Sequence, residues 1–212
     1  MTMTTGKIEL LFFEEWVIID FLSKIKNYSA NSKYIELLIS LSLIKFCERQ
    51  WDAKCWVGIE LKNKYKKKNS QKQHATYNEL NEIMTKQANE DTPVDVTIAK
   101  IPERQGHSSY GMHFQIKRFG VSKDKQDTQS LINFLNNDCA QYGKSQTNLI
   151  ILIESPEEID LQLLKQSIKT DSYPFEKIIL TGLSESKYIN YYGIWPESGW
   201  SRYNLDNFQF EF

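Results

Sequence analysis

The chain has 212 residues, of which 41% are hydrophobic and 25% are charged, and its formal net charge is −1. This composition is that of an ordinary globular protein with a sizeable core, and it excludes a strongly basic protein that binds nucleic acid through overall charge. Glu14, Glu15 and Asp20 interrupt the one apolar run near the N-terminus, so we expect neither a signal peptide nor a membrane partner. The three cysteines have no metal-binding or redox spacing, which indicates reduced thiols in a cytoplasmic protein.

Apolar residues at helical spacing predict two helices in the first quarter of the chain, Leu10–Lys26 and Lys33–Gln50. Cys55–Leu61 is rich in strand-forming residues and predicts a strand. Glu36 and Glu48 of the second helix are candidate carboxylates for a metal site, and solvated surface carboxylates are the simpler interpretation of both.

The segment from Lys62 to His74 is rich in lysine and has no apolar period, which predicts a loop. Lysines of this kind can contact phosphates without reading sequence, and a solvated loop is an equally weighted alternative. The residues that we expect to contact nucleic acid are Lys64, Lys66, Lys67, Lys68, Arg118 and Lys123.

The next segment, Thr76–Asn89, has the apolar spacing of a helix. Thr76 followed three residues later by Glu79 has the form of a capping box, in which each side chain bonds to the backbone of the other residue. If Glu79 is used in this cap, Glu82 is the better candidate for a catalytic carboxylate on this helix.

Two extended runs, Val94–Ile101 and Met112–Phe119, follow and are separated by turn-forming residues, so they predict an antiparallel hairpin. The first strand carries Asp95. The second carries Gln115 and Lys117, which project from one face because residues two apart in a strand point the same way.

The rest of the chain predicts alternating helices and strands, which is typical of an α/β fold with a mixed central sheet flanked by helices. The predicted helices are Asp124–Tyr142 and Glu157–Lys169, and the predicted strands are Thr147–Glu154, Lys177–Leu183, Tyr188–Trp195 and Asn207–Phe212. We expect an N-terminal helix in residues 1–32, the α/β core in residues 33–183, and an aromatic β extension of the same domain in residues 184–212.

The predicted hairpin brings together groups suited to phosphodiester hydrolysis. Asp95 offers a carboxylate, Gln115 an amide oxygen and Ile116 a peptide carbonyl, and these are oxygen ligands of the kind that Mg²⁺ prefers. Lys117 would orient the attacking water or contact the phosphate, and Glu82 would add a second carboxylate.

Pro93-Val94-Asp95 and Gln115-Ile116-Lys117-Arg118-Phe119 resemble the motif of the PD-(D/E)XK nuclease superfamily, in the Q-x-K variant of Mrr-like restriction endonucleases. Gln115 stands where the family usually has an acidic residue. The resemblance implies a restriction endonuclease-like core, a Mg²⁺ cofactor, DNA as partner, and phosphodiester hydrolysis in restriction, repair or phage defence.

Glu60-Leu-Lys62 also fits the short motif, but the order strand, strand, helix, strand favours Gln115 and Lys117. Alternatives remain open at this stage. The chain could be a non-catalytic module on the same fold that binds nucleic acid or protein, or a small toxin, immunity or effector protein with the aromatic C-terminus as its contact surface. A homodimer is a further open alternative.

Overall fold

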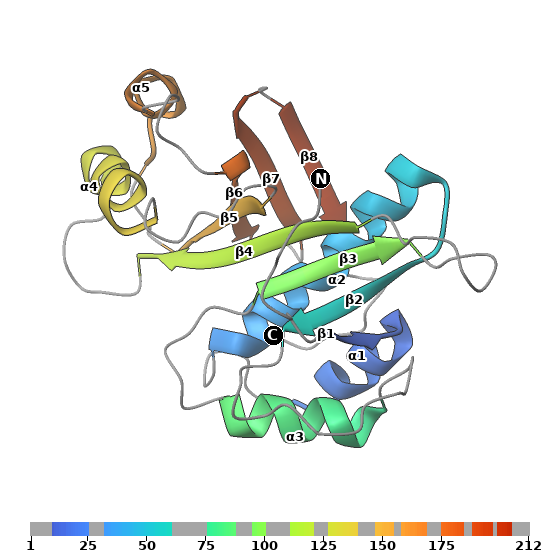
Figure 1. The fold of residues 1–212 in the computed structure, drawn as a ribbon. Coiled ribbons are helices and arrows are strands. Elements are labelled where there is room, and N and C mark those ends of the chain that lie inside the picture. Colours follow the sequence, from blue (N-terminus) through green and yellow to red (C-terminus); the bar gives the residue numbers. More distant parts are fainter. Residues whose placement is uncertain are drawn as a thin grey trace, which may run out of the picture. The chain divides into compact units, whose positions relative to one another are not determined.

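The structure is a computed structural model, which describes residues 10–25, 32–60, 76–87, 95–100, 111–120, 127–139, 147–154, 158–168, 175–184, 188–196 and 199–204 (Figure 1). The chain divides into two compact units, and the division falls within strand β4 (Gly111–Phe119). The first unit contains Met1–Met112 and the second contains His113–Asn207.

The described part of the first unit holds an antiparallel group of strands and three helices. Strand β1 (Leu10–Phe13) pairs with β2 (Cys55–Glu60), and β2 pairs with β3 (Asp95–Lys100). Helix α2 (Ser32–Trp51) packs on β2 and β3, and α1 (Glu15–Ser23) packs on α2 and on α3 (Tyr77–Gln87).

Helix α2 is buried over most of its length, and not along one stripe as its periodicity indicates. Every residue from Ile35 to Ile44 is buried, including Glu36, Ser40 and Ser42. The hydroxyl groups of both serines donate to backbone carbonyls three residues earlier, so the helix satisfies them internally. Because Glu36 is only 5% exposed, its interpretation as a solvated surface carboxylate is wrong.

The predicted helix Leu10–Lys26 is wrong over its first four residues. Leu10–Phe13 form β1, and Glu14 has extended backbone angles before α1 begins at Glu15. The four large apolar residues of β1 pair in register with β2, from Leu10 opposite Glu60 to Phe13 opposite Val57. This long-range pairing overrides the local helical spacing.

Helix α3 begins with the predicted capping box. The Thr76 backbone N–H donates to Glu79 Oε2 at 2.9 Å, and the Glu79 N–H donates to Thr76 Oγ1 at 3.5 Å. This arrangement uses the Glu79 carboxylate at the helix terminus.

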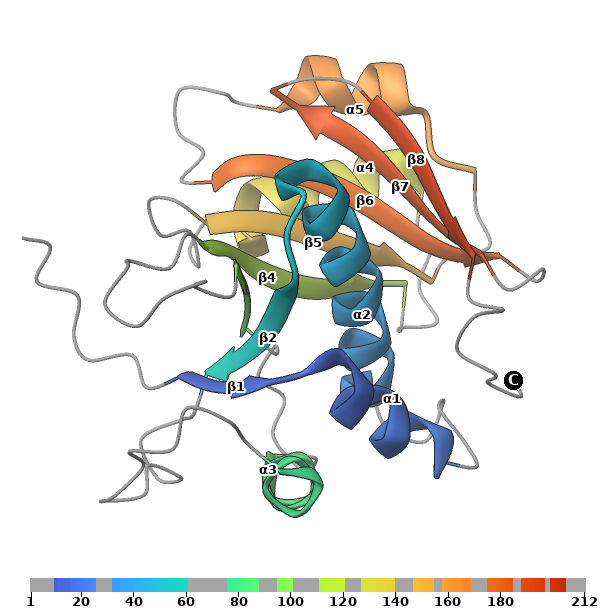
Figure 2. The same ribbon diagram turned by 90° about the vertical axis from the view of Figure 1, so that its right-hand side faces the viewer.

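The second unit is a mixed sheet with helices against it. Strand β4 pairs with β5 (Thr147–Ile153) in parallel, and β5 pairs with β6 (Phe175–Ser184) in parallel. The strands β7 (Tyr188–Trp195) and β8 (Gly199–Asn204) complete it as antiparallel neighbours (Figure 2). These pairings and their flanking helices confirm the predicted α/β class with a mixed sheet.

One face of this sheet packs against α4 (Thr128–Asn133), the π-helix η3 (Phe134–Cys139) and α5 (Leu161–Ser167), and the two α-helices lie beside each other (Figure 1). Three features of the predicted elements are corrected. The helix predicted over Asp124–Tyr142 turns into a π-helix at Phe134. Helix α5 begins at Leu161 because Asp160 caps it by accepting two backbone N–H groups. Strand β8 begins at Gly199, where the sequence predicts part of a turn, and residues 205–212 lie outside the described part of the chain.

In the described ranges, no helix combines the length and the apolar character that crossing a membrane requires.

Candidate functional site

Gln115 and Lys117 lie in the second unit, on the face of β4 that the helices cover. In the parallel register, Gln115 is opposite Leu149 and Lys117 is opposite Ile151. Leu149 and Ile151 both belong to the core beneath α4 and α5. The two polar side chains therefore share the face that the alternation of strand residues predicts.

Gln115 is the unusual member of this pair. It is only 7% exposed, and its Oε1 atom is buried with no hydrogen-bond partner among the described residues. A buried amide oxygen without a partner typically costs about 1–3 kcal/mol. Such an atom is suited to accept a bond from a ligand, a water molecule or a metal ion.

The positive charge of Lys117 lies near the end of the π-helix. Burial raises the pKa of the Cys139 thiol to about 12, while the charge of Lys117 lowers it and that of Asp138 raises it. Lys117 is half-buried, and its charge lies within electrostatic reach of Cys139. π-Helical segments are rare and often lie at functional sites.

Arg118 points to the opposite face of β4 and has a partner within the second unit. Its guanidinium donates to both carboxylate oxygens of Glu154, with Nε to Oε2 at 2.8 Å and NH2 to Oε1 at 2.6 Å. Both side chains are 22% exposed. The pair closes the end of the β4–β5 ladder, where the Glu154 N–H also donates to the Phe119 carbonyl at 2.8 Å. This neutralising pair does not favour the predicted role of Arg118 in binding nucleic acid.

The other predicted site residues are placed only in part. Asp95 is the first residue of β3 in the first unit, and its side chain is outside the described part of the structure. Glu82 is half-buried on α3. The structure describes none of the predicted phosphate-contacting lysines, which are Lys64, Lys66, Lys67, Lys68 and Lys123.

The start of β4 lies against β3, within the first unit. A Cβ at Gly111 would come 3.1 Å from the Ile98 carbonyl oxygen and 3.4 Å from the Thr97 methyl carbon. The first residue of β4 therefore contacts β3 closely, as the predicted hairpin requires, while the connecting segment lies outside the described residues.

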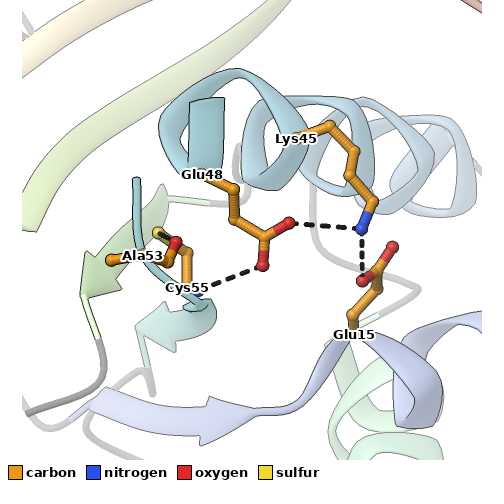
Figure 3. A network of polar contacts seen from close by, with 5 residues as sticks. All are labelled: Glu15, Lys45, Glu48, Ala53 and Cys55. Atoms are coloured by element: carbon orange, nitrogen blue, oxygen red, sulfur yellow. Dashed lines mark hydrogen bonds and ion pairs between the residues drawn. The ribbon is translucent and has the colours of Figure 1, made fainter. Parts of the chain in front are cut away.

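Glu48, the other carboxylate considered on α2, belongs to a network in the first unit (Figure 3). Its Oε1 accepts the Cys55 backbone N–H at 3.2 Å, and its Oε2 accepts the Lys45 ammonium at 3.2 Å. Lys45 also donates to Glu15 Oε2 at 2.7 Å. Burial lowers the pKa of Lys45, but the bond and charge of Glu15, followed by those of Glu48, outweigh it and raise the pKa.

This network joins α1, α2 and β2, so Glu48 serves the structure of the unit. The carboxylate also contributes to raising the pKa of the Cys55 thiol to about 11, after the larger effect of burial. Cys55 is therefore protonated at neutral pH and is not a nucleophile.

Sequence reasoning missed the pairing of Glu15 with Lys45 and of Arg118 with Glu154, because both join residues far apart in the chain. It also missed the π-helix.

Among the described residues, no group of three or more histidine, cysteine, aspartate or glutamate side chains could hold a metal ion.

No protein-family model matches this chain, and neither does any curated protein or solved structure with which it was compared.

Proposed function

We propose that the chain is a Mg²⁺-dependent nuclease that hydrolyses DNA phosphodiester bonds, with a restriction endonuclease-like core. The observation that carries this proposal is the buried Oε1 atom of Gln115, which has no partner among the described residues, two positions before Lys117 on the same face of β4.

The order of elements supports the proposal. Helix α2 is followed by β2, α3 and β3, and β2 and β3 pair in antiparallel fashion. Strand β4, the helical segment α4–η3 and β5 then follow β3 in turn. Strands β4 and β5 are parallel, with the helical segment between them in the sequence. This is the strand, strand, helix, strand order that the motif requires.

The proposed ligands are oxygen atoms, which suit a hard cation such as Mg²⁺. The Gln115 amide oxygen is a ligand type that Mg²⁺ accepts, and Mg²⁺ usually binds through one or two carboxylates and retains several waters. Asp95 would provide the carboxylate, Ile116 a peptide oxygen, and Glu82 a further carboxylate. When bound, the cation would lower the pKa of a water ligand and offset the charge that develops on the phosphate.

In this scheme, Lys117 orients the water or the phosphate. Lys117 lies opposite Ile151 of the buried core, and its charge is close enough to Cys139 to lower the pKa of that thiol. A cation at this position would offset charge that develops on a bound phosphate.

Cleavage of a supercoiled plasmid with Mg²⁺ tests the proposal. Asp95→Asn and Lys117→Ala should each lower the cleavage rate by at least about a hundredfold, because each removes a ligand or a charge used in the transition state. Lys177→Ala is the matched control, since Lys177 is an exposed lysine of β6 in the same unit, and it should cleave at the native rate.

Gln115→Leu separates function from stability. Removing the buried amide should keep or raise the free energy of unfolding, because it eliminates an unsatisfied polar atom, while cleavage is lost. Equal cleavage by native protein and by all three site variants, or no cleavage by native protein with Mg²⁺ or Mn²⁺, would rule out the enzyme.

A non-catalytic nucleic-acid- or protein-binding module is the second candidate. The neutral side chain at Gln115 and the use of Arg118 by Glu154 favour it, because both reduce the charge available for catalysis. Calorimetric titration distinguishes the two: binding of DNA without heat from Mg²⁺ or Mn²⁺ indicates the module.

A further inference from the structure

The first unit contains a pocket of about 530 Å³, a size typical of ligand sites. Three segments line it: the junction of β1 with α1, the last turns of α2, and the start of β2. The same region holds the network of Glu15, Lys45 and Glu48 (Figure 3), which fixes one wall.

Trp16 is the feature of the pocket that indicates a ligand. It is 60% exposed, more than any other large hydrophobic side chain that the structure describes. Its indole N–H donates to Glu14 Oε2 at 3.1 Å, so the ring is oriented although it is not packed in the core. A large aromatic side chain that is exposed and oriented at a pocket is suited to stack on a flat or cationic group.

The charges of the lining select the sign of the ligand. Four carboxylates and two ammonium groups line the pocket. Lys45 already bonds to Glu15 and Glu48, so its charge is largely neutralised. Asp52 is exposed at the end of α2, and Glu14 orients the indole. Lys54 is the second ammonium group and is exposed. Four carboxylates against two ammonium groups leave the lining with an excess of negative charge, which favours a cation over a phosphate and distinguishes this pocket from the proposed nuclease site.

We propose that this pocket binds an arginine side chain of a partner protein. A guanidinium is planar and stacks on an indole, and its fork of N–H donors bonds to two carboxylate oxygens at once. Asp52 is an exposed carboxylate of the same lining as Trp16, and Glu14, which accepts the indole N–H, adds a second negative charge there. The pocket is large enough to hold residues that flank the arginine as well as its side chain, which favours a peptide segment over a free amino acid.

Calorimetric titration and tryptophan fluorescence of the full chain test this site, with acetyl-Gly-Arg-Gly-amide as the probe. The peptide in which citrulline replaces arginine is the matched ligand control, because it has nearly the same shape without the charge. We expect saturable binding of the arginine peptide, about tenfold weaker binding of the citrulline peptide, and weaker binding of a lysine peptide.

Two variants locate the site. Trp16→Ala should weaken binding by about tenfold and remove most of the fluorescence change, with little effect on stability because the side chain is exposed. Asp52→Asn should weaken binding, whereas Asp20→Asn, an exposed aspartate of the same unit that bonds to Lys24, should not.

The inference is overturned if arginine and citrulline peptides bind equally, if Trp16→Ala binds as well as the native chain, or if Asp20→Asn weakens binding as much as Asp52→Asn. Equal affinity for arginine amide and the tripeptide would overturn the assignment to a partner protein. None of these outcomes depends on DNA cleavage, so the site and the proposed nuclease fail separately.

Discussion

Asp52 occupies a backbone position that glycine or asparagine usually takes. Its φ angle is 46°, in the left-handed region, directly after the last residue of α2. The Ala53 N–H donates to the Glu48 carbonyl at 3.3 Å, which is the bond of a helix that ends in a left-handed residue. An aspartate here has two disadvantages, because its backbone is in a disfavoured region and its charge lies at the negative end of the helix dipole.

We predict that Asp52→Asn stabilises the protein. Removing a negative charge from an exposed helix C-terminus contributes about 0.3–1 kcal/mol, and asparagine tolerates the left-handed region better than aspartate does. The sum is about 1 kcal/mol, which corresponds to a rise of about 2–4 °C in Tm for a chain of this length. Added salt should reduce the gain, because part of it is electrostatic.

Urea unfolding followed by circular dichroism measures this change, provided that the m-value stays constant. Asp20→Asn is the control, and it should lower the free energy of unfolding instead of raising it. The Asp20 carboxylate accepts the Lys24 ammonium at 2.8 Å, and losing this exposed i,i+4 pair should cost a few tenths of a kcal/mol. An Asp52→Asn variant less stable than the native chain would refute the argument, since it would mean that Asp52 has a stabilising partner.

Three further predictions concern packing and ionisation. Gly58→Ala should lower the free energy of unfolding by about 1–3 kcal/mol, because its Cβ would lie 2.8 Å from the Phe12 ring. Gly182→Ala, with nothing within 4 Å of its Cβ, should leave that free energy nearly unchanged, and an equal loss in both would contradict this reasoning. The pKa values of about 11 for Cys55 and about 12 for Cys139 predict that these two thiols do not react with a disulfide reagent at pH 8 until urea unfolds the chain. Because the pKa values of both thiols in the folded chain exceed the ordinary value of 9.0, the free energy of unfolding should fall as pH rises from about 9 toward 12. A free energy of unfolding that stays constant across that range would contradict the inference that burial raises these pKa values.

The sequence predicts best the elements whose pattern is local. Helix α2 and strand β5 fall within one or two residues of their predicted ranges, because a long apolar periodicity and a continuous apolar run leave few alternatives. The capping box of α3 was also predicted, since its two bonds join residues three apart.

Elements that depend on distant partners were not predictable in this way. Leu10–Phe13 has helical spacing, and only its pairing with β2 makes it a strand. The neutralisation of Arg118 depends on Glu154, 36 residues away. The candidate site was predicted as a list of residue types, and the sequence gives no means of seeing that Gln115 is buried without a partner.

The residues that carry the two proposals are those at which the local rules are broken. Many described carboxylates have ordinary structural roles: those of Asp127 and Asp160 cap helices, and Glu154 bonds to Arg118. Asn148 Oδ1 and Thr181 Oγ1 are also buried without a hydrogen-bond partner among the described residues, but neither residue belongs to the predicted motif. Gln115 instead leaves a buried oxygen unsatisfied, and Asp52 holds a strained backbone at a pocket. Both features cost stability, and substitutions without that cost exist at each position. Because such departures concentrate at functional positions, Gln115 and Asp52 are better candidates for functional residues than the satisfied carboxylates around them.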